Sequence, residues 1–220
     1  MTDTEIELRG LGLGLSAAKG AKRSPDRREA ICAAVFELLG EVGYDRMTMD
    51  AIAARARASK ATLYRTWPDK PGLVAEALTW RFGATPEAPD TGSLRGDLMA
   101  LVSLACRISN SPDGEVLTGV MTAAARNPTL ARTLHECTFE SKQVILETIV
   151  RRAAGRGQLR EQADAGLLHE TMYAMIIARK LTSGEPMDAA YAAHVVDDVL
   201  IPVLANRPSG HDRPPDGPAA

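Results

Sequence analysis

Residues 47–70 read MTMDAIAARARASKATLYRTWPDK, and this stretch decides how the front of the chain folds. Thr48 offers a hydroxyl cap to a short helix that the apolar spacing predicts over 48–56. Ser59 offers a second cap to a helix over 59–66. Two short helices joined by a tight turn form the helix-turn-helix pattern, whose second helix lies in the major groove when such proteins bind DNA.

The second of these helices presents polar side chains outward while Leu63 faces inward. At its start, Lys60 can donate a hydrogen bond to guanine, and the methyl group of Thr62 can pack on thymine. Arg65, one turn later, can contact a base or a phosphate. A short basic helix is also common as a solvated surface, so DNA binding needs support from the wider sequence.

Other groups near this helix suit phosphate rather than bases. They are the hydroxyl groups of Thr48 and Tyr64, the free amides at the start of the first helix, and the ammonium group of Lys70. Such contacts fix the position of the protein and carry no sequence information. The predicted DNA-binding residues are therefore Thr48, Met49, Ser59, Lys60, Ala61, Thr62, Tyr64, Arg65 and Lys70.

The wider stretch MTMDAIAARARASKATLYRTWPDKPGLVAEAL, residues 47–78, resembles the N-terminal region of the TetR family of bacterial transcriptional regulators. The densest match is T-L-Y-x-x-W-x-x-K, and the resemblance covers about residues 27–80. It implies an all-α protein with backbone contacts from Thr48, Tyr64 and Lys70. It also implies a transcriptional regulator, most often a repressor, that a small ligand releases from a near-palindromic double-stranded DNA operator.

Two positions depart from the pattern of the family, in which residues 59–65 form the recognition helix. Arg57 stands where the family commonly has the glycine of the turn. If that position keeps a left-handed backbone, arginine should cost roughly 1 kcal/mol there. Thr66 stands where a larger aromatic, His or Arg side chain is common, which puts a phosphate contact from that position in doubt.

The rest of the chain also predicts helices, because glycine and proline punctuate it and alternating β-branched runs are scarce. Apolar residues on one helical face predict a first helix from Asp26 to Leu39, closed by Gly40 and Gly43. Pro202 should bend or end the last helix near Ile201. The other helices are expected near 70–82, 93–109, 113–126, 128–154, 163–182 and 187–205.

These elements predict an N-terminal three-helix bundle with the helix-turn-helix, followed by a larger helical domain. The resemblance implies that this second domain binds a ligand and dimerises. Between residues 17 and 82 there are 12 Lys/Arg against 8 Asp/Glu, whereas residues 83–220 have 13 against 17, so only the front has the sign that DNA favours. The predicted segments are a flexible leader at 1–22, the DNA-binding domain at 23–68, the ligand-binding and dimerisation domain at 69–205 and a disordered tail at 206–220. The basic leader is either a solvated segment or an additional DNA contact.

Composition favours a soluble cytoplasmic protein. Apolar residues make up 45% of the chain and charged residues 25%, as in globular proteins. Asp3, Glu5 and Glu7 stand where a secretory signal carries positive charge, and no apolar run approaches the ~18 residues of a membrane span. The three cysteines are too dispersed for a disulfide framework or a C-x-x-C metal site, and His135 and Glu136 point in different directions on a helix. No metal or cofactor is expected.

The expectations for the second domain, which are its dimer interface and its ligand pocket, come mainly from the resemblance. It implies that helices 163–182 and 187–205, which are apolar on more than one side, form a four-helix bundle with the same pair from a second subunit. Large pliable side chains stand on the helices that line the pocket in similar proteins, and they suit a mainly apolar ligand that Tyr173 or His169 would steer. For any single one of them, ordinary core is the commoner role. The candidates are Trp80, Met99, Leu104, Met121, Phe139, His169, Met172, Tyr173 and Ile176.

Two other classes of function stay open at this point. A helical enzyme would need a nucleophile with a base, or clustered carboxylates, and no such arrangement has suggestive spacing, so no catalytic residues are predicted. A DNA-architectural or protein-binding helical module would have no small-molecule site. Sequence-specific DNA binding that a ligand changes would separate the regulator from both.

Overall fold

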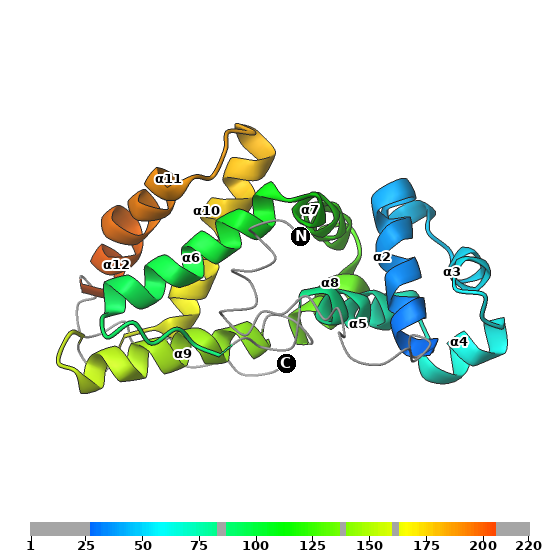
Figure 1. Ribbon diagram of the computed structural model, residues 1–220, viewed down its shortest axis with the longest axis horizontal. Coiled ribbons are helices and arrows are strands. Elements are labelled where there is room, and N and C mark those ends of the chain that lie inside the picture. The colour runs from blue at the N-terminus through cyan, green and yellow to red at the C-terminus, as the bar shows by residue number, and fades with distance from the viewer. Residues whose placement is uncertain (1–26, 83–86, 137–139, 160–162, 206–220) are drawn as a thin grey trace, which may run out of the picture.

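The computed structural model describes residues 27–82, 87–136, 140–159 and 163–205, and every regular element within these ranges is a helix, as predicted (Figure 1). The elements are α2 (Arg27–Arg46), α3 (Met49–Arg55), α4 (Lys60–Thr66), α5 (Lys70–Phe82), α6 (Leu94–Asn110), α7 (Pro112–Ala124), α8 (Pro128–Leu134), α9 (Glu140–Gly155), α10 (Ala165–Thr182), α11 (Ala189–His194), the π-helical η2 (Val195–Leu200) and α12 (Ile201–Ala205). The molecule is elongated, with α2, α3 and α4 at one end and α9 to α12 at the other (Figure 1).

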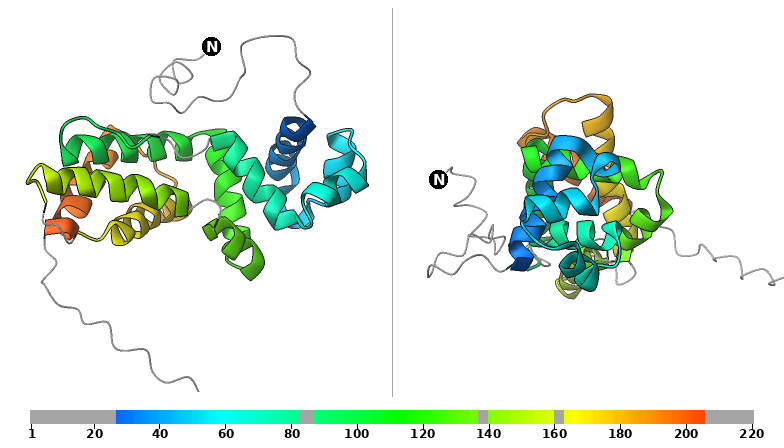
Figure 2. Two further views of the ribbon diagram at one scale, coloured as in Figure 1. Left: turned by 90° about the horizontal axis from the view of Figure 1, so that it is seen from below. Right: turned by 90° about the vertical axis from the view of Figure 1, so that its right-hand side faces the viewer.

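Two separate apolar cores stabilise this arrangement. The front core joins α2, α3, α4 and α5 with residues of α7 and α8. The rear core joins α6, α9, α10, α11, η2 and α12. Helices α7 and α8 therefore follow α6 in the chain but pack against the bundle that contains the helix-turn-helix (Figure 2). The most buried front-core residues include Ile31, Val35, Ile52, Leu63, Leu73, Val74, Leu78, Val120, Leu130 and Leu134.

Of the two glycines predicted to close the first helix, Gly43 interrupts it but Gly40 does not. Helix α2 continues through Gly40 and is interrupted only at Gly43, whose backbone has φ 74° and ψ 169°. Glycine inside a helix costs up to about 1 kcal/mol relative to alanine. Burial of Leu39 and Tyr44, on either side of these glycines, offsets that cost.

The single helix predicted over 128–154 is two helices in the structure. Helix α8 ends at Leu134 and packs in the front core, whereas α9 begins at Glu140 and packs in the rear core. Neither glycine nor proline separates them, so the sequence offered no conventional stop signal. The division follows from the change of packing partner between the two cores.

The last helix is modified, rather than ended, ahead of Pro202. Residues Val195–Leu200 form a π-helical segment, and the amide of Ile201 donates to the carbonyl of Val196, five residues back. Helix α12 then continues through Pro202 to Ala205. Proline lacks an amide hydrogen, and the wider π-helical turn before it disturbs the helix as predicted without stopping it.

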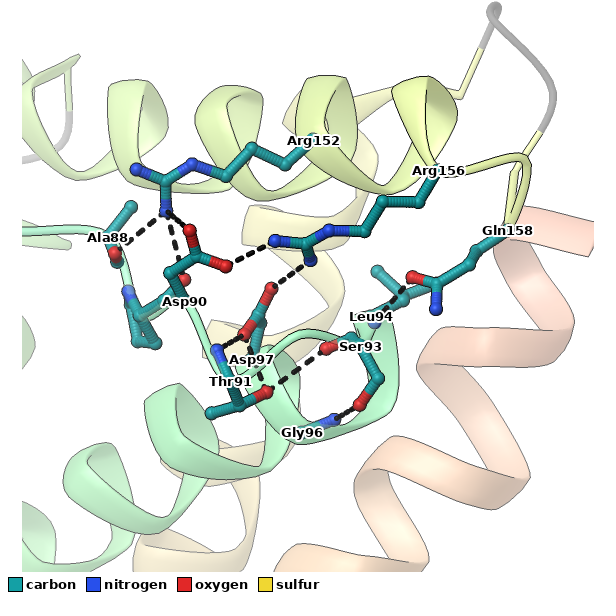
Figure 3. Close-up of polar contacts among 11 residues, drawn as sticks. Ala88, Asp90, Thr91, Ser93, Leu94, Gly96, Asp97, Arg152, Arg156 and Gln158 are labelled. Carbon is teal, nitrogen blue, oxygen red and sulfur yellow. Dashed lines mark hydrogen bonds and ion pairs between the residues drawn. The ribbon is translucent and has the colours of Figure 1, made fainter.

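A polar network holds the start of α6 against the end of α9 (Figure 3). The Asp97 carboxylate is fully buried and accepts from the amide and hydroxyl of Thr91 over 2.6 and 2.7 Å. Arg156 reaches Asp97 over 3.4 Å and also pairs with Asp90, while Arg152 donates to backbone carbonyls of the same loop. The Arg156 guanidinium lowers the pKa of Asp90. This network fixes the loop before α6 and thereby the frame of the rear core.

None of the helices within the described ranges is long and apolar enough to cross a bilayer. No group of three or more His, Cys, Asp or Glu side chains in that part of the chain is placed to hold a metal ion. The predicted leader at 1–22 and tail at 206–220 lie outside the described residues.

Candidate nucleic-acid interface

Both predicted caps begin the helices of the helix-turn-helix. The hydroxyl of Thr48 accepts from the amide of Ala51 over 3.2 Å at the start of α3. The hydroxyl of Ser59 accepts from the amide of Thr62 over 3.2 Å at the start of α4, and the two hydroxyls of Ser59 and Thr62 lie 2.8 Å apart. Each cap satisfies an amide that the first helical turn leaves without a partner.

The turn between α3 and α4 places an arginine in a left-handed conformation. Arg57 has φ 51°, the only positive value at a non-glycine position in the described part of the chain. Its amide donates to Ala54 over 3.2 Å, and the amide of Ala58 donates to Ala53 over 2.9 Å. This pair of bonds is the Schellman motif, in which glycine is the usual left-handed residue. Because Arg57 does keep a left-handed backbone, the predicted cost of roughly 1 kcal/mol for arginine at this position applies.

The inward side of α4 is anchored to the bundle behind it. Leu63 is fully buried, and Trp67, directly after α4, is buried with its indole Nε1 donating to Glu76 Oε2 over 2.8 Å. Arg28 of α2 donates to the same carboxylate over 2.8 Å. The Arg28 bond, followed by the Trp67 bond, lowers the pKa of Glu76. One carboxylate on α5 thus holds α2 and the end of α4 together.

The outward side of α4 carries the residues predicted to meet DNA. Lys60, Ala61, Tyr64 and Arg65 are exposed, and Thr62 is half-buried beside its cap. Tyr64 is 51% exposed, so its ring and hydroxyl are accessible to a partner. With exposed Thr48 and Ser59, these residues belong to α3, α4 and their N-terminal caps. The two helices lie at one end of the molecule (Figure 1).

Two of the predicted DNA-binding residues are less exposed than the others: Met49 is buried and Lys70 is half-buried. The Met49 side chain is buried, so only its backbone amide, in the first turn of α3, is suited to a phosphate. The Lys70 ammonium donates to the carbonyls of Tyr44 and Met47 over 2.9 and 3.0 Å and lies 4.1 Å from the centre of the Tyr44 ring. Burial lowers the pKa of Lys70. Lys70 thereby positions the segment that leads into the Thr48 cap.

Sequence reasoning missed two contacts of this unit. Lys60 Nζ donates to Asp50 Oδ2 over 2.6 Å, a contact that was not predicted. The contacts of Glu76 with Trp67 and Arg28 were also not predicted, because a lone glutamate on an amphipathic helix gives no sign of partners 9 and 48 residues away. Opposite charges near the starts of the two helices were the available signal for the first contact.

The predicted ligand-binding residues fall into two groups. Trp80 and Met121 pack against the front core. Met99, Met172 and Ile176 belong to or pack against the rear core, and the rings of His169 and Tyr173 lie 6.3 Å apart on α10. Leu104 is buried on α6, and Phe139 lies outside the described residues.

Two surface pockets of the described residues are lined by other side chains. A surface pocket of about 410 Å³ lies between α9 and the start of α10, and another of about 310 Å³ lies between α2 and α7, but neither is lined by a predicted ligand residue. Burial raises the pKa of the Tyr173 phenol, so its hydroxyl is a neutral hydrogen-bonding group at physiological pH.

Comparison with known proteins gives consistent matches over both parts of the chain. The family description "Bacterial regulatory proteins, tetR family" matches residues 31–77, and "Tetracyclin repressor-like, C-terminal domain" matches residues 88–199. An HTH-type transcriptional regulator of Mycobacterium tuberculosis, itself uncharacterised, is 34% identical over 81% of this chain and 88% of that protein.

Two further relatives agree with this result. The DNA-binding transcriptional repressor TetR of Mycobacteroides abscessus is 33% identical over 83% of this chain and 96% of its own length. The crystal structure of a TetR family transcription regulator superposes with a TM-score of 0.65 and 28% identity, covering 80% of this chain and 97% of that chain. The similarity therefore extends over both cores and over nearly the full length of these relatives.

Proposed function

We propose a function from the premise that this chain belongs to the TetR family of bacterial transcriptional regulators, which are DNA-binding proteins rather than enzymes. The protein is a cytoplasmic homodimer that binds a near-palindromic operator as a repressor. A small, mainly apolar ligand releases it from that operator. The single observation that carries the proposal is the capped recognition helix α4, with Leu63 buried and Tyr64 exposed.

The outward side chains of α4 suit the major groove. Lys60 and Arg65 can donate to guanine, and the exposed ring and hydroxyl of Tyr64 can reach the sugar-phosphate backbone. Two copies of α4 in a dimer would enter successive major grooves roughly 34 Å apart. That spacing accounts for a near-palindromic site, because the symmetry of the operator mirrors that of the protein.

Support for the dimer comes from the outward face of α10. Its buried face carries Ala165, Leu168, Met172 and Ile176, and its opposite face is exposed. That exposed face repeats at helical spacing and is mostly small or apolar, which suits close packing against a second helix. Its members are Leu167, Glu170, Ala174, Ala178 and Leu181.

Ligand control requires a path between the two cores, and α5 and α7 provide one. Arg81, in the last turn of α5, pairs with Asp113 at the start of α7 over 2.7 Å. Helix α7 begins where α6 of the rear core ends, and its own buried residues belong to the front core. A ligand that prefers one arrangement of these helices would change the spacing of the recognition helices and shift the population off DNA.

Replacement of Arg65 by alanine tests the DNA-binding part of this proposal. The operator is first selected from a library of random duplexes with the wild-type protein, and binding is then measured across a salt titration. We expect Arg65→Ala to weaken operator binding about tenfold or more, because an arginine contact to DNA contributes roughly 1–3 kcal/mol. Sedimentation should show an unchanged oligomeric state.

Arg132→Ala is the matched control, because it removes the same charge from an exposed position on α8. It should bind the operator as the wild-type protein does. Operator binding by Arg65→Ala at wild-type affinity would exclude α4 as the recognition helix. Release of the wild-type complex by one compound from an apolar library tests the ligand-controlled part separately.

A further inference from the structure

An ion pair joins the two helices of the helix-turn-helix at their N-terminal ends. Lys60 Nζ lies 2.6 Å from Asp50 Oδ2, and the two side chains stay 63% and 59% exposed. Asp50 is the second residue of α3, and Lys60 is the first residue of α4. The pair therefore lies on the part of the surface where the residues proposed to contact DNA are found.

The ion pair between Asp50 and Lys60 adds little to the stability of the fold. An exposed lysine–carboxylate pair contributes little to folding, because solvent screens it and two long side chains must be ordered. The start of a helix does favour a negative charge, but any carboxylate in the first turn of α3 would meet that preference without Lys60. A negative charge on a surface that approaches phosphates also opposes binding.

The chemistry of the major groove gives this carboxylate a use. Lysine donates to the O6 and N7 atoms of guanine, and a carboxylate accepts from the N4 amino group of cytosine. Because Asp50 and Lys60 are in contact, the Asp50 carboxylate presents a hydrogen-bond acceptor to the major groove beside the donor of the Lys60 ammonium. On a duplex without the matching bases, the carboxylate faces acceptor atoms and phosphates and is repelled.

We propose that Asp50 is a specificity-determining residue, an inference that rests on the proposed function. It holds Lys60 in position, accepts from a cytosine amino group at the correct operator, and weakens binding to all other DNA. The helix-turn-helix therefore recognises sequence with the first turn of α3 as well as with α4. Loss of the carboxylate should broaden sequence preference while leaving the fold intact.

The experiment compares full-length wild-type protein with Asp50→Asn and with Glu37→Gln. Glu37 is a matched control, because it is 60% exposed, pairs with Arg55 over 3.1 Å and lies on the flank where α2 meets α3. Both substitutions remove one negative charge with little change of shape. Each protein selects its preferred sites from a random duplex library, and its affinities for the wild-type site and for a scrambled duplex are measured at several salt concentrations.

We expect Asp50→Asn to bind the scrambled duplex about fivefold more tightly at low salt, because one repelling charge near the phosphates is gone. Its selected sites should lose preference at one base-pair position in each half-site. Glu37→Gln should match the wild-type protein in both respects. In a Lys60→Ala background, the Asp50 substitution should change the selected sites less, because the carboxylate no longer has a side chain to hold in position.

Unchanged selected sites and an unchanged ratio of specific to non-specific affinity for Asp50→Asn would overturn the inference. An equal change in Glu37→Gln would also overturn it, because net charge alone would then explain the effect. A wild-type protein that selects no sequence at all would instead refute the proposed function. Thermal unfolding of each variant verifies that the comparison is made between folded proteins.

Discussion

At the scale of single residues, Arg57 is the clearest case of local strain in the helix-turn-helix. Its φ of 51° places the backbone in the left-handed region, where a Cβ atom crowds the following carbonyl. The side chain is exposed and makes no hydrogen bond or ion pair within the described ranges that could offset this cost. The Schellman bonds of Arg57 and Ala58 hold the conformation in place.

Glycine at this position should therefore stabilise the protein. We expect Arg57→Gly to raise the free energy of unfolding by about 1 kcal/mol, net of the greater freedom of glycine in the unfolded chain. For a protein of this size, Tm should rise by about 2–4 °C in calorimetry. Arg57→Ala removes the same charge but keeps the strained backbone, so its Tm should stay near the wild-type value. Equal stabilisation by both variants would point to charge repulsion instead.

At the scale of secondary-structure elements, Glu76 is the joint that places the recognition helix. Its carboxylate, on α5, accepts from Arg28 on α2 and from the indole of Trp67 at the end of α4. Three elements thus meet at one half-buried side chain. Local caps start α4, but its direction relative to the bundle depends on this contact and on the burial of Leu63.

Removal of this negative charge should weaken the bundle in a pH-dependent way. We expect Glu76→Gln to lower the free energy of unfolding at pH 7 by about 1–3 kcal/mol, since hydrogen bonds to a charged acceptor are lost. The folded pKa of Glu76 lies below its ordinary 4.5, so its contribution is complete above the unfolded value and is lost as pH falls through the folded value.

Urea denaturation at several pH values from 7 down to 3.5 measures this dependence. The difference between wild-type protein and Glu76→Gln should shrink as the pH falls. Glu115→Gln removes an exposed carboxylate from α7 and should change stability little at any of these pH values. A wild-type advantage that stays constant down to pH 3.5 would show that packing, rather than the charge of Glu76, is responsible.

At the scale of the whole molecule, neither core is formed by one continuous segment. The chain passes from the front core to the rear core and then repeats that order. Helix α7 enters the front core directly after α6, and α9 returns the chain to the rear core. Arg81 and Asp113 join α5 to α7, and Arg126 lies 3.4 Å from Asp45 of α2. The DNA-binding end is therefore connected to the rest of the molecule along both ends of α7.

The outward face of α10 makes the proposed dimer testable. We expect Leu181→Glu to weaken dimerisation at least tenfold, because a charge would be buried without a partner in the interface. The Leu181 side chain is 59% exposed within one subunit, so the substitution should leave the subunit folded. Val144→Glu on α9, at a position 55% exposed, is the control and should remain dimeric. Sedimentation velocity across a concentration series distinguishes monomer from dimer.

A Leu181→Glu protein that dimerises as the wild type does would exclude this face of α10 from the interface. The same variant should bind a full operator more weakly than the wild-type protein, because two recognition helices must act together. Its affinity for a single half-site should be unchanged. Equal loss of affinity for both duplexes would indicate damage to the DNA-binding end itself.

The helix-turn-helix could be predicted from the order of residues alone. The caps at Thr48 and Ser59 and the buried position of Leu63 follow from residues within a few positions of one another. Capping and helical periodicity are local interactions, and local interactions can be read directly from the order of residues. The all-α fold class and the resemblance to the family rest on the same information.

Only the tertiary structure decided which distant residues meet. In the structure, the Lys70 ammonium donates to carbonyls 26 and 23 residues away, and Arg28 donates to Glu76. The helix predicted over 128–154 is instead α8 and α9, which pack in different cores. Trp80 and Met172 are both large apolar residues on predicted helices, yet they pack in different cores. Burial and long-range hydrogen bonding depend on how elements approach one another in space, and no local pattern of residues specifies that approach.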